Sequence, residues 1–211
     1  MQSVMRAMIE LVSSGVKQLG LGMAILALAL ASPAAAQFTD SYNFIKAVKD
    51  KDGAKAQEIL DKPGTTVVNT RDSDTGDTGL HIAVKRGDIA WVGFLLQKGA
   101  SANARDREGN TPLMIAAQTR WSEGVQVFVQ IKVQIDLQNR LGETALMKAV
   151  QGRDADMAKL LIDAGANPDL SDNSGMSARS LAANDPRATQ IAKLFKDLPV
   201  RKAKPAQGPS L

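Results

Sequence analysis

The sequence predicts a mainly α protein, a solenoid of stacked helix pairs joined by short β-hairpin loops. Three observations predict this fold class. A seven-residue motif returns every 33 residues, a glycine stands two residues before each copy, and an apolar helical stripe repeats in the same phase. A single pair of short helices cannot bury its apolar face alone, so we expect the pairs to stack into one continuous core.

The first 36 residues precede the repeats and are typical of a bacterial secretory signal peptide. An apolar run of thirteen residues, 19–31, is followed by Pro33 and then by three alanines that suit a signal peptidase. A membrane-spanning helix needs roughly 20 apolar residues. We therefore expect cleavage between Ala36 and Gln37, a periplasmic or secreted protein, and no stable membrane insertion. Retention of this segment as an anchor is the alternative.

Composition narrows the function classes. Residues 37–198 carry 21 basic and 21 acidic side chains, and the net charge of +4 comes mostly from Arg201, Lys202 and Lys204 near the end of the sequence. A basic surface of the kind that binds nucleic acid is therefore not supported for the folded part. The chain contains no cysteine, which excludes disulfides, thiol catalysis and covalent c-type haem.

The four copies of the motif define the first helix of each unit. They are T-G-L-H-I-A-V from Thr78, T-P-L-M-I-A-A from Thr111, T-A-L-M-K-A-V from Thr144 and S-A-R-S-L-A-A from Ser177. The preceding glycines are Gly76, Gly109, Gly142 and Gly175, and glycine suits the left-handed residue of a hairpin turn. A second, longer helix is predicted by apolar positions three residues apart: Val92 and Leu95, Val125 and Phe128, Ala158 and Leu161, Ile191 and Leu194.

A 33-residue unit with a Thr-Pro-Leu-His-like core resembles the ankyrin repeat. The resemblance covers nearly all of residues 37–198: an N-terminal cap at 38–65, repeats at about 74–106, 107–139 and 140–172, and a C-terminal cap at 173–198. In the N-terminal cap, residues 42–60 give a helix pair without the core motif. Arg179 replaces a leucine in the C-terminal cap, as expected of a terminal unit. Residues 199–211 lack apolar periodicity, so we expect a disordered basic tail there.

The only histidine, His81, lies in the first motif copy. The resemblance implies that Thr78 and His81 hydrogen-bond to each other and to the neighbouring loop, and that Thr111 and Thr144 begin their helices as Thr78 does. Met114, Met147 and Ser180 stand at the His81 position in later units, so we expect the polar link to be weaker there. A functional role for His81 is the less favoured alternative.

Two patterns in the first hairpin suggest chemistry but are incomplete. Asp74-Thr75-Gly76 spells the aspartic-protease signature, yet that chemistry needs two such loops. Asp72-Ser73-Asp74 suggests a calcium loop, but Ala83 stands where a bidentate glutamate is required. A polar turn is the better interpretation, and weak calcium binding is the alternative. We expect no catalytic residue, no metal site, no cofactor and no enzymatic activity.

Function is therefore expected on the surface. The resemblance implies that another protein binds at the hairpin tips and along the exposed face of the first helices. The second and third units depart most from the pattern. Trp121 stands where Asp88 and Asp154 are found, Leu141 occupies a hairpin tip, and Arg120 and Lys132 replace Gly87 and Gly99.

Tryptophan and arginine are enriched among the residues that dominate binding energy. The predicted partner-binding residues are Arg107, Asn110, Gln118, Trp121, Arg140, Leu141, Glu143 and Met176. For Trp121, folding back over its own turn is the alternative. We expect a monomer that binds one partner protein of unknown identity. The alternative function is a structural or stabilising factor for an exported enzyme or envelope complex, contacted through the basic tail.

Overall fold

A computed structural model describes residues 33–201. Nearly all of the predicted signal peptide and residues 202–211 of the predicted tail lie outside the described residues. Helix α2 (Pro33–Asp50) begins well before the expected start at Tyr42, because proline suits the first position of a helix and the alanines that follow are strong helix formers. The stack described below comprises the residues from Phe44 onward.

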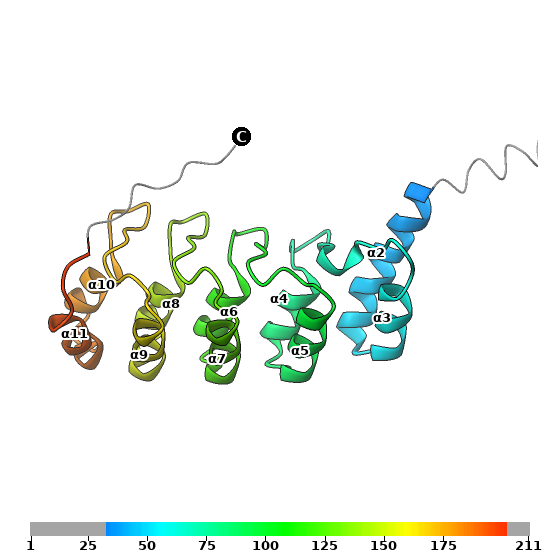
Figure 1. Ribbon diagram of the computed structural model, residues 1–211. Helices are drawn as coiled ribbons and strands as arrows, with labels where there is room; N and C mark the ends of the chain where they lie inside the picture. Colours follow the sequence, from blue (N-terminus) through cyan, green and yellow to red (C-terminus); the bar gives the residue numbers. More distant parts are fainter. Residues whose placement is uncertain (1–32, 202–211) are drawn as a thin grey trace, which may run out of the picture. The chain divides into compact units, whose positions relative to one another are not determined.

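Helices follow one another in pairs along the chain. The first members are α2, α4 (Gly79–Lys85), α6 (Pro112–Gln118), α8 (Ala145–Gln151) and α10 (Ala178–Asn184). The second members are α3 (Gly53–Leu60), α5 (Ile89–Gln97), α7 (Ser122–Gln130), α9 (Ala155–Asp163) and α11 (Thr189–Lys196), and the short 3-10 helix η1 (Val67–Asn69) follows α3. Figure 1 shows the pairs from α4 to α11 side by side in chain order, with their hairpin loops on one side. The predicted solenoid of helix pairs is confirmed.

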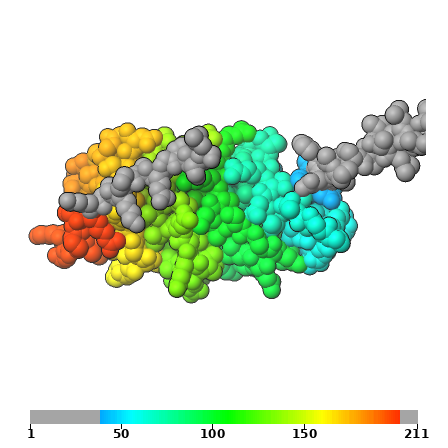
Figure 2. Space-filling view, turned by 45° about the horizontal axis from the view of Figure 1, so that its top comes forward, coloured from blue at the N-terminus to red at the C-terminus, as the bar shows by residue number. Residues whose placement is uncertain are grey.

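The surface shows the same order. In Figure 2 the colours of the described residues run in sequence order along the stack, so each unit has only its sequence neighbours beside it. Within residues 33–201 no helix is long and apolar enough to cross a membrane.

Helices α6 and α8 each begin directly after a threonine whose side chain caps the helix. The Thr111 hydroxyl accepts a hydrogen bond from the Met114 N–H, and the Thr144 hydroxyl accepts one from the Met147 N–H, each at 3.3 Å. Such a bond satisfies one of the backbone donors that a helix start leaves free. Thr111 and Thr144 are buried, which agrees with the structural role predicted for them.

The second helices supply the core through the predicted stripe. Leu95, Phe128 and Leu161 are completely buried. In the last unit Phe195 takes this place, and Leu194 is only half-buried. The reason is that α11 begins at residue 189, one residue later than the 33-residue phase requires.

The predicted hairpins form as short loops rather than as strands. The second to fourth loops are closed by hydrogen bonds from Asp106 N to Asn110 O, from Asn139 N to Glu143 O and from Asp172 N to Met176 O, at 2.9 to 3.0 Å. The first loop is one residue longer, because its bond runs from Asp72 N to Asp77 O. Within the described part of the chain, β-pairing is limited to the isolated bridges Arg71 to Thr78 and Ser171 to Ser177.

Neighbouring hairpins lie in close contact. At Gly76, where φ is +71°, an added Cβ would lie 2.7 Å from the Arg107 nitrogen. Backbone hydrogen bonds then join the tips in sequence: Arg107 N to Thr75 O at 3.1 Å, Arg140 N to Glu108 O at 3.0 Å and Asn173 N to Leu141 O at 2.9 Å. The tips therefore form one connected row.

A second series of hydrogen bonds joins the loops that follow the outer helices. Asn69 accepts from Ser101 N, Asn103 from Gln134 N, Asp136 from Asn167 N and Asp169 from Arg201 N, at 2.7 to 3.2 Å. Arg201 thus occupies the place of the next repeat's loop. Arg201, which the prediction assigned to the tail, is held by Asp169 and Gly165 of the third repeat.

The C-terminal unit is closed by Arg179, as its position in the motif predicts. The Arg179 guanidinium forms an ion pair with Asp169 at 2.6 Å and donates to the Phe195 carbonyl. This guanidinium also lies over the Phe195 ring, 5.9 Å from its centroid. An arginine here covers the apolar end of the stack while its charge stays paired.

Candidate protein-interaction surface

The tip surface consists of the exposed side chains of the second to fourth hairpins: Arg107, Glu108, Arg140, Leu141, Asn173 and Ser174. Leu141 is 64% exposed, although it is a large apolar residue. The Arg107 guanidinium donates to the Ser73 carbonyl at 2.6 Å, and the Arg140 side chain has no ion pair or hydrogen bond among residues 33–201. Two cationic groups, one carboxylate and one apolar group therefore stand on a connected backbone row.

The first helices form the floor beneath the tips, and its lysines are neutralised. Lys85 pairs with Asp77 at 2.8 Å, and Lys148 pairs with Glu143. Gln118, at the end of α6, is exposed, and its contact with a partner stays a prediction. The middle of the floor is therefore uncharged, and the free positive charge lies at the tips.

Glu143 is a structural residue, which corrects its prediction as a partner contact. Its residue exposure is only 8%, and its carboxylate accepts from Asn139 at 2.9 Å, from Gln151 at 2.7 Å and from Lys148. Burial raises the pKa of Glu143, but the hydrogen bonds lower it by more, so the net pKa lies below its ordinary value. The carboxylate is charged and already fully engaged.

Asn110 and Met176 are half-buried and make contacts inside the stack. The Asn110 side chain accepts from Asn139 at 2.9 Å and donates to Asp106 at 3.2 Å. Met176 is half-buried, and its sulfur lies 4.0 Å from the Ser180 hydroxyl. These contacts connect the hairpins to the helices below, and the partner contacts predicted for both residues stay predictions.

Trp121 folds back onto its own helix, as the alternative interpretation proposed. It is half-buried and caps α7 without a side-chain hydrogen bond. A Cβ added at Gly124 would lie 2.1 Å from Trp121 Cε3, so the indole covers this glycine. Helix α6 separates Trp121 from the hairpins by about 10 Å, given 1.5 Å per residue. Trp121 is therefore not part of the tip surface.

The substituted turn glycines keep the turn geometry. Arg120 and Lys132 have φ values of 57° and 56°, in the left-handed region where Gly87 and Gly99 also lie. A side chain in this conformation costs about 1 kcal/mol relative to glycine. Arg120 also donates to the Gly152 carbonyl of the next repeat, so this turn is strained but connected rather than disrupted.

His81 has the structural role that the sequence predicts. It is completely buried. Its Nδ1 lies 2.8 Å from the Thr78 hydroxyl, and its Nε2 lies 3.1 Å from the Asn110 carbonyl of the next hairpin. Burial lowers the pKa of His81 below 6.5, so the imidazole is neutral at pH 7 and can both donate and accept.

The first hairpin has the structure of a polar turn. Asp72 pairs with Lys49 at 2.5 Å and accepts from the backbone of Asp74 and Thr75. The Lys49 hydrogen bond lowers the pKa of Asp72 to about 2, against the opposing effect of burial. Within residues 33–201 no group of three or more His, Cys, Asp or Glu side chains could hold a metal ion.

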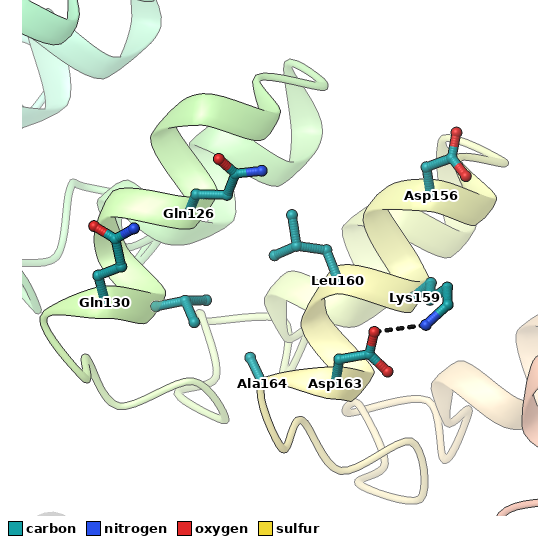
Figure 3. A pocket seen from close by; sticks show the side chains of 8 residues that line it. Gln126, Gln130, Asp156, Lys159, Leu160, Asp163 and Ala164 are labelled. Carbon is teal, nitrogen blue, oxygen red and sulfur yellow. Dashed lines mark hydrogen bonds and ion pairs between the residues drawn. The ribbon is translucent and has the colours of Figure 1, made fainter.

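Sequence reasoning missed a cleft between α7 and α9. It has a volume of about 500 Å³ and is lined by Gln126, Val129, Gln130, Asp156, Lys159, Leu160, Asp163 and Ala164. Figure 3 shows Leu160 pointing from α9 toward α7, with Lys159 paired to Asp163 at 2.6 Å on the rim. The sequence does contain one sign of this cleft: Ala164 is small where the two earlier repeats have Lys98 and Ile131.

A connected row of hairpin tips above stacked helix pairs is typical of solenoid proteins, which bind through their extended surfaces. The protein-family model described as ankyrin repeats (3 copies) matches residues 35–139 and 121–202. The chain belongs to the ankyrin-repeat family. Ankyrin repeats generally mediate protein–protein interaction.

Three curated relatives are similar over part of the chain. Oxysterol-binding protein homolog 1 of Saccharomyces cerevisiae is 30% identical over 97 residues, which are 44% of this chain and 8% of the relative. The mouse 2-5A-dependent ribonuclease is 36% identical over 77 residues, 36% of this chain and 10% of the relative. Mouse Rabankyrin-5 is 35% identical over 68 residues, 32% of this chain and 6% of the relative. The chain spans a tenth or less of each relative, so the likeness concerns the repeats alone.

Proposed function

We propose that this chain is a non-catalytic protein-interaction module of the bacterial periplasm, which binds a partner protein through the tip surface and the first helices beneath it. The observation that carries this proposal is Leu141. An apolar side chain that is 64% exposed stands beside Arg140 on a hydrogen-bonded backbone row. A hydrogen-bonded backbone row loses little backbone conformational entropy on binding, so the ordering cost is limited to the side chains themselves.

The alternative, contact through the basic tail, has less support. Arg201 is the first basic residue of that tail; its backbone N–H donates to Asp169 and its guanidinium donates to the Gly165 carbonyl. By contrast, the Arg140 guanidinium has no hydrogen bond or ion pair among the described residues, so Arg140 is better placed to recognise an acidic group of another protein.

Affinity capture tests the binding surface. The triple variant Arg107→Ala/Arg140→Ala/Leu141→Ala removes the tip groups, and Ile89→Ala/Arg187→Ala/Lys193→Ala removes two cations and one exposed apolar side chain elsewhere. All six positions are exposed, so both variants should fold. We expect the tip variant to lose the partner and the control variant to retain it. Equal recovery of the partner by both variants would contradict the proposal.

Export is a separate part of the proposal and rests on residues 1–36. An apolar run followed by small residues before Gln37 supports it. Cell fractionation and mass spectrometry of the N-terminus test it. We expect a periplasmic protein that begins at Gln37, and accumulation of the uncleaved chain when Ala36→Glu places a charge at the cleavage site. A cytoplasmic protein with an intact first segment would contradict export without affecting the binding surface.

A further inference from the structure

The cleft between α7 and α9 has the character of a peptide-binding groove. Val129, Leu160 and Ala164 give it an alkyl floor. The amides of Gln126 and Gln130 stand on the α7 side, where they can bond to an extended backbone (Figure 3).

The α9 side of this cleft is acidic. Asp156 and Asp163 line it, and Lys159 offsets only one of these two charges through its ion pair with Asp163. The side chain of Asp156 has no ion pair within residues 33–201. The cleft therefore suits an extended segment that is basic and carries small or apolar side chains.

The chain itself leads to this cleft. After α11 it returns to the third repeat, where Arg201 N donates to Asp169 at 2.8 Å and the Arg201 guanidinium donates to the Gly165 carbonyl at 3.2 Å. Gly165 follows Ala164 directly, and Ala164 lines the cleft. The Arg201 charge also acts on Asp136, in the loop that follows α7. Arg201 therefore lies near the ends of both helices that form the cleft.

The segment that follows Arg201 fits the cleft in charge and reach. Residues 202–211 read K-A-K-P-A-Q-G-P-S-L, with two lysines and no acidic residue. Ten residues can extend over about 33 Å, whereas the nine residues of α9 span only about 13 Å. The prolines favour an extended backbone that has few internal hydrogen bonds.

We propose that residues 202–211 dock in the cleft between α7 and α9, with their lysines toward Asp156 and Asp163 and their backbone beside Gln126 and Gln130. The segment then covers the outer helices of the second and third repeats. It leaves the tip surface open, so this inference does not depend on the proposed partner-binding site.

A disulfide test is favourable because the protein has no cysteine of its own. One variant pairs Gln130→Cys with Ala206→Cys. Its matched control pairs Lys196→Cys with Ala206→Cys. Gln130 and Lys196 are the last residues of α7 and α11, the outer helices on either side of α9, and both are exposed. A freely moving segment anchored at Arg201 would reach both positions with similar frequency.

Docking predicts that the Gln130 variant closes an intramolecular disulfide about ten times faster than the Lys196 control, the ratio given by a docking free energy of about 1.4 kcal/mol. Closure is read from the faster-migrating monomer under non-reducing conditions. Equal rates, or no closure in either variant, would overturn the proposal. A dimer linked through the cysteine introduced by Gln130→Cys would overturn the proposal in favour of a second copy of the chain in the cleft.

Charge reversal gives an independent measurement. Lys202→Glu/Lys204→Glu in the Gln130 variant should slow closure several-fold at low salt, because these side chains would then meet Asp156 and Asp163. In the unmodified protein, removal of residues 202–211 should shift the amide resonances of Val129, Gln130 and Ala164. Unchanged closure or unchanged resonances would contradict docking in this cleft.

Discussion

Two glycines in the outer helices should respond in opposite ways to the same substitution. Gly93 lies within α5, and an added Cβ there would meet no atom within 4 Å. Gly124 lies within α7, where an added Cβ would stand 2.1 Å from Trp121 Cε3. Alanine is favoured over glycine in a helix by about 1 kcal/mol. Gly93→Ala should therefore stabilise the protein by about this amount.

Gly124→Ala gains the same helical preference but must displace the Trp121 indole. Trp121 is half-buried, and exposing about 100 Å² of its ring at 25 cal/mol per Å² costs about 2.5 kcal/mol. The net effect is a destabilisation of about 1.5 kcal/mol. For a domain of this size, the melting temperature should fall by about 3 to 6 °C for Gly124→Ala and rise by about 2 to 4 °C for Gly93→Ala.

Thermal unfolding followed by circular dichroism measures both shifts. A Trp121→Ala background supplies the control, because Gly124→Ala should become stabilising once the indole is absent. In a Trp91→Phe background, the Trp121 emission should also move to longer wavelength in the Gly124→Ala variant. The reasoning is refuted if Gly124→Ala raises the melting temperature as much as Gly93→Ala does.

Three other predictions follow from single contacts. Because burial lowers the pKa of His81 below 6.5, the unfolded state binds more protons than the folded state, and stability should fall as the pH drops below about 6.5. His81→Met should remove this pH dependence of the unfolding free energy in urea titrations, and an unchanged pH dependence would contradict the buried, neutral state of His81. Because the pKa of Asp72 is about 2 rather than 3.8, its contribution to the free energy of unfolding should be lost as the pH falls from 3.8 to 2. Asp72→Asn should flatten the acid-unfolding curve in this range, and a curve identical to that of the unmodified protein would count against the pair with Lys49. Lys132→Gly should raise stability by about 1 kcal/mol, because it relieves the strain of a side chain at a φ of 56°; Gly165→Ala, at the equivalent position of the next repeat, should lower stability. A loss of stability in Lys132→Gly would show that the lysine side chain contributes more than the strain costs.

The sequence predicted those features that depend on local chemistry repeated in phase. Thr111 and Thr144 cap their helices as the motif requires, and His81 makes the expected bonds to Thr78 and to the next hairpin. Each of these interactions joins residues at fixed positions within a repeat or one repeat apart. A period read from the sequence therefore locates them.

The errors concern residues whose environment depends on one unit's own side chains. Glu143 occupies a tip position by phase, but Lys148 and Gln151 on the following helix draw its carboxylate into the stack. Trp121 was predicted to contact a partner, but Gly124, one helical turn later, leaves room for the indole to fold back. These details depend on non-periodic pairs, which the repeat pattern does not reveal.

The length adjustments at both ends also lay outside the pattern. The first hairpin gains one residue, as its bond from Asp72 to Asp77 shows. The last unit is shifted by one residue, so Phe195 replaces Leu194 in the core and Arg201 takes the ladder position expected for residue 200. The last unit has one neighbour instead of two, so a shift is tolerated there.

The most direct test of the proposed binding surface compares two exposed aliphatic side chains. Leu141 lies on the tip surface and is 64% exposed, and Ile131 lies at the end of α7 and is 47% exposed. A photo-crosslinking amino acid placed at either position in the native host reports which face meets a partner. We predict a covalent adduct with a partner protein from position 141 and none from position 131. An adduct from position 131 alone, or from neither position, would contradict binding through the hairpin tips.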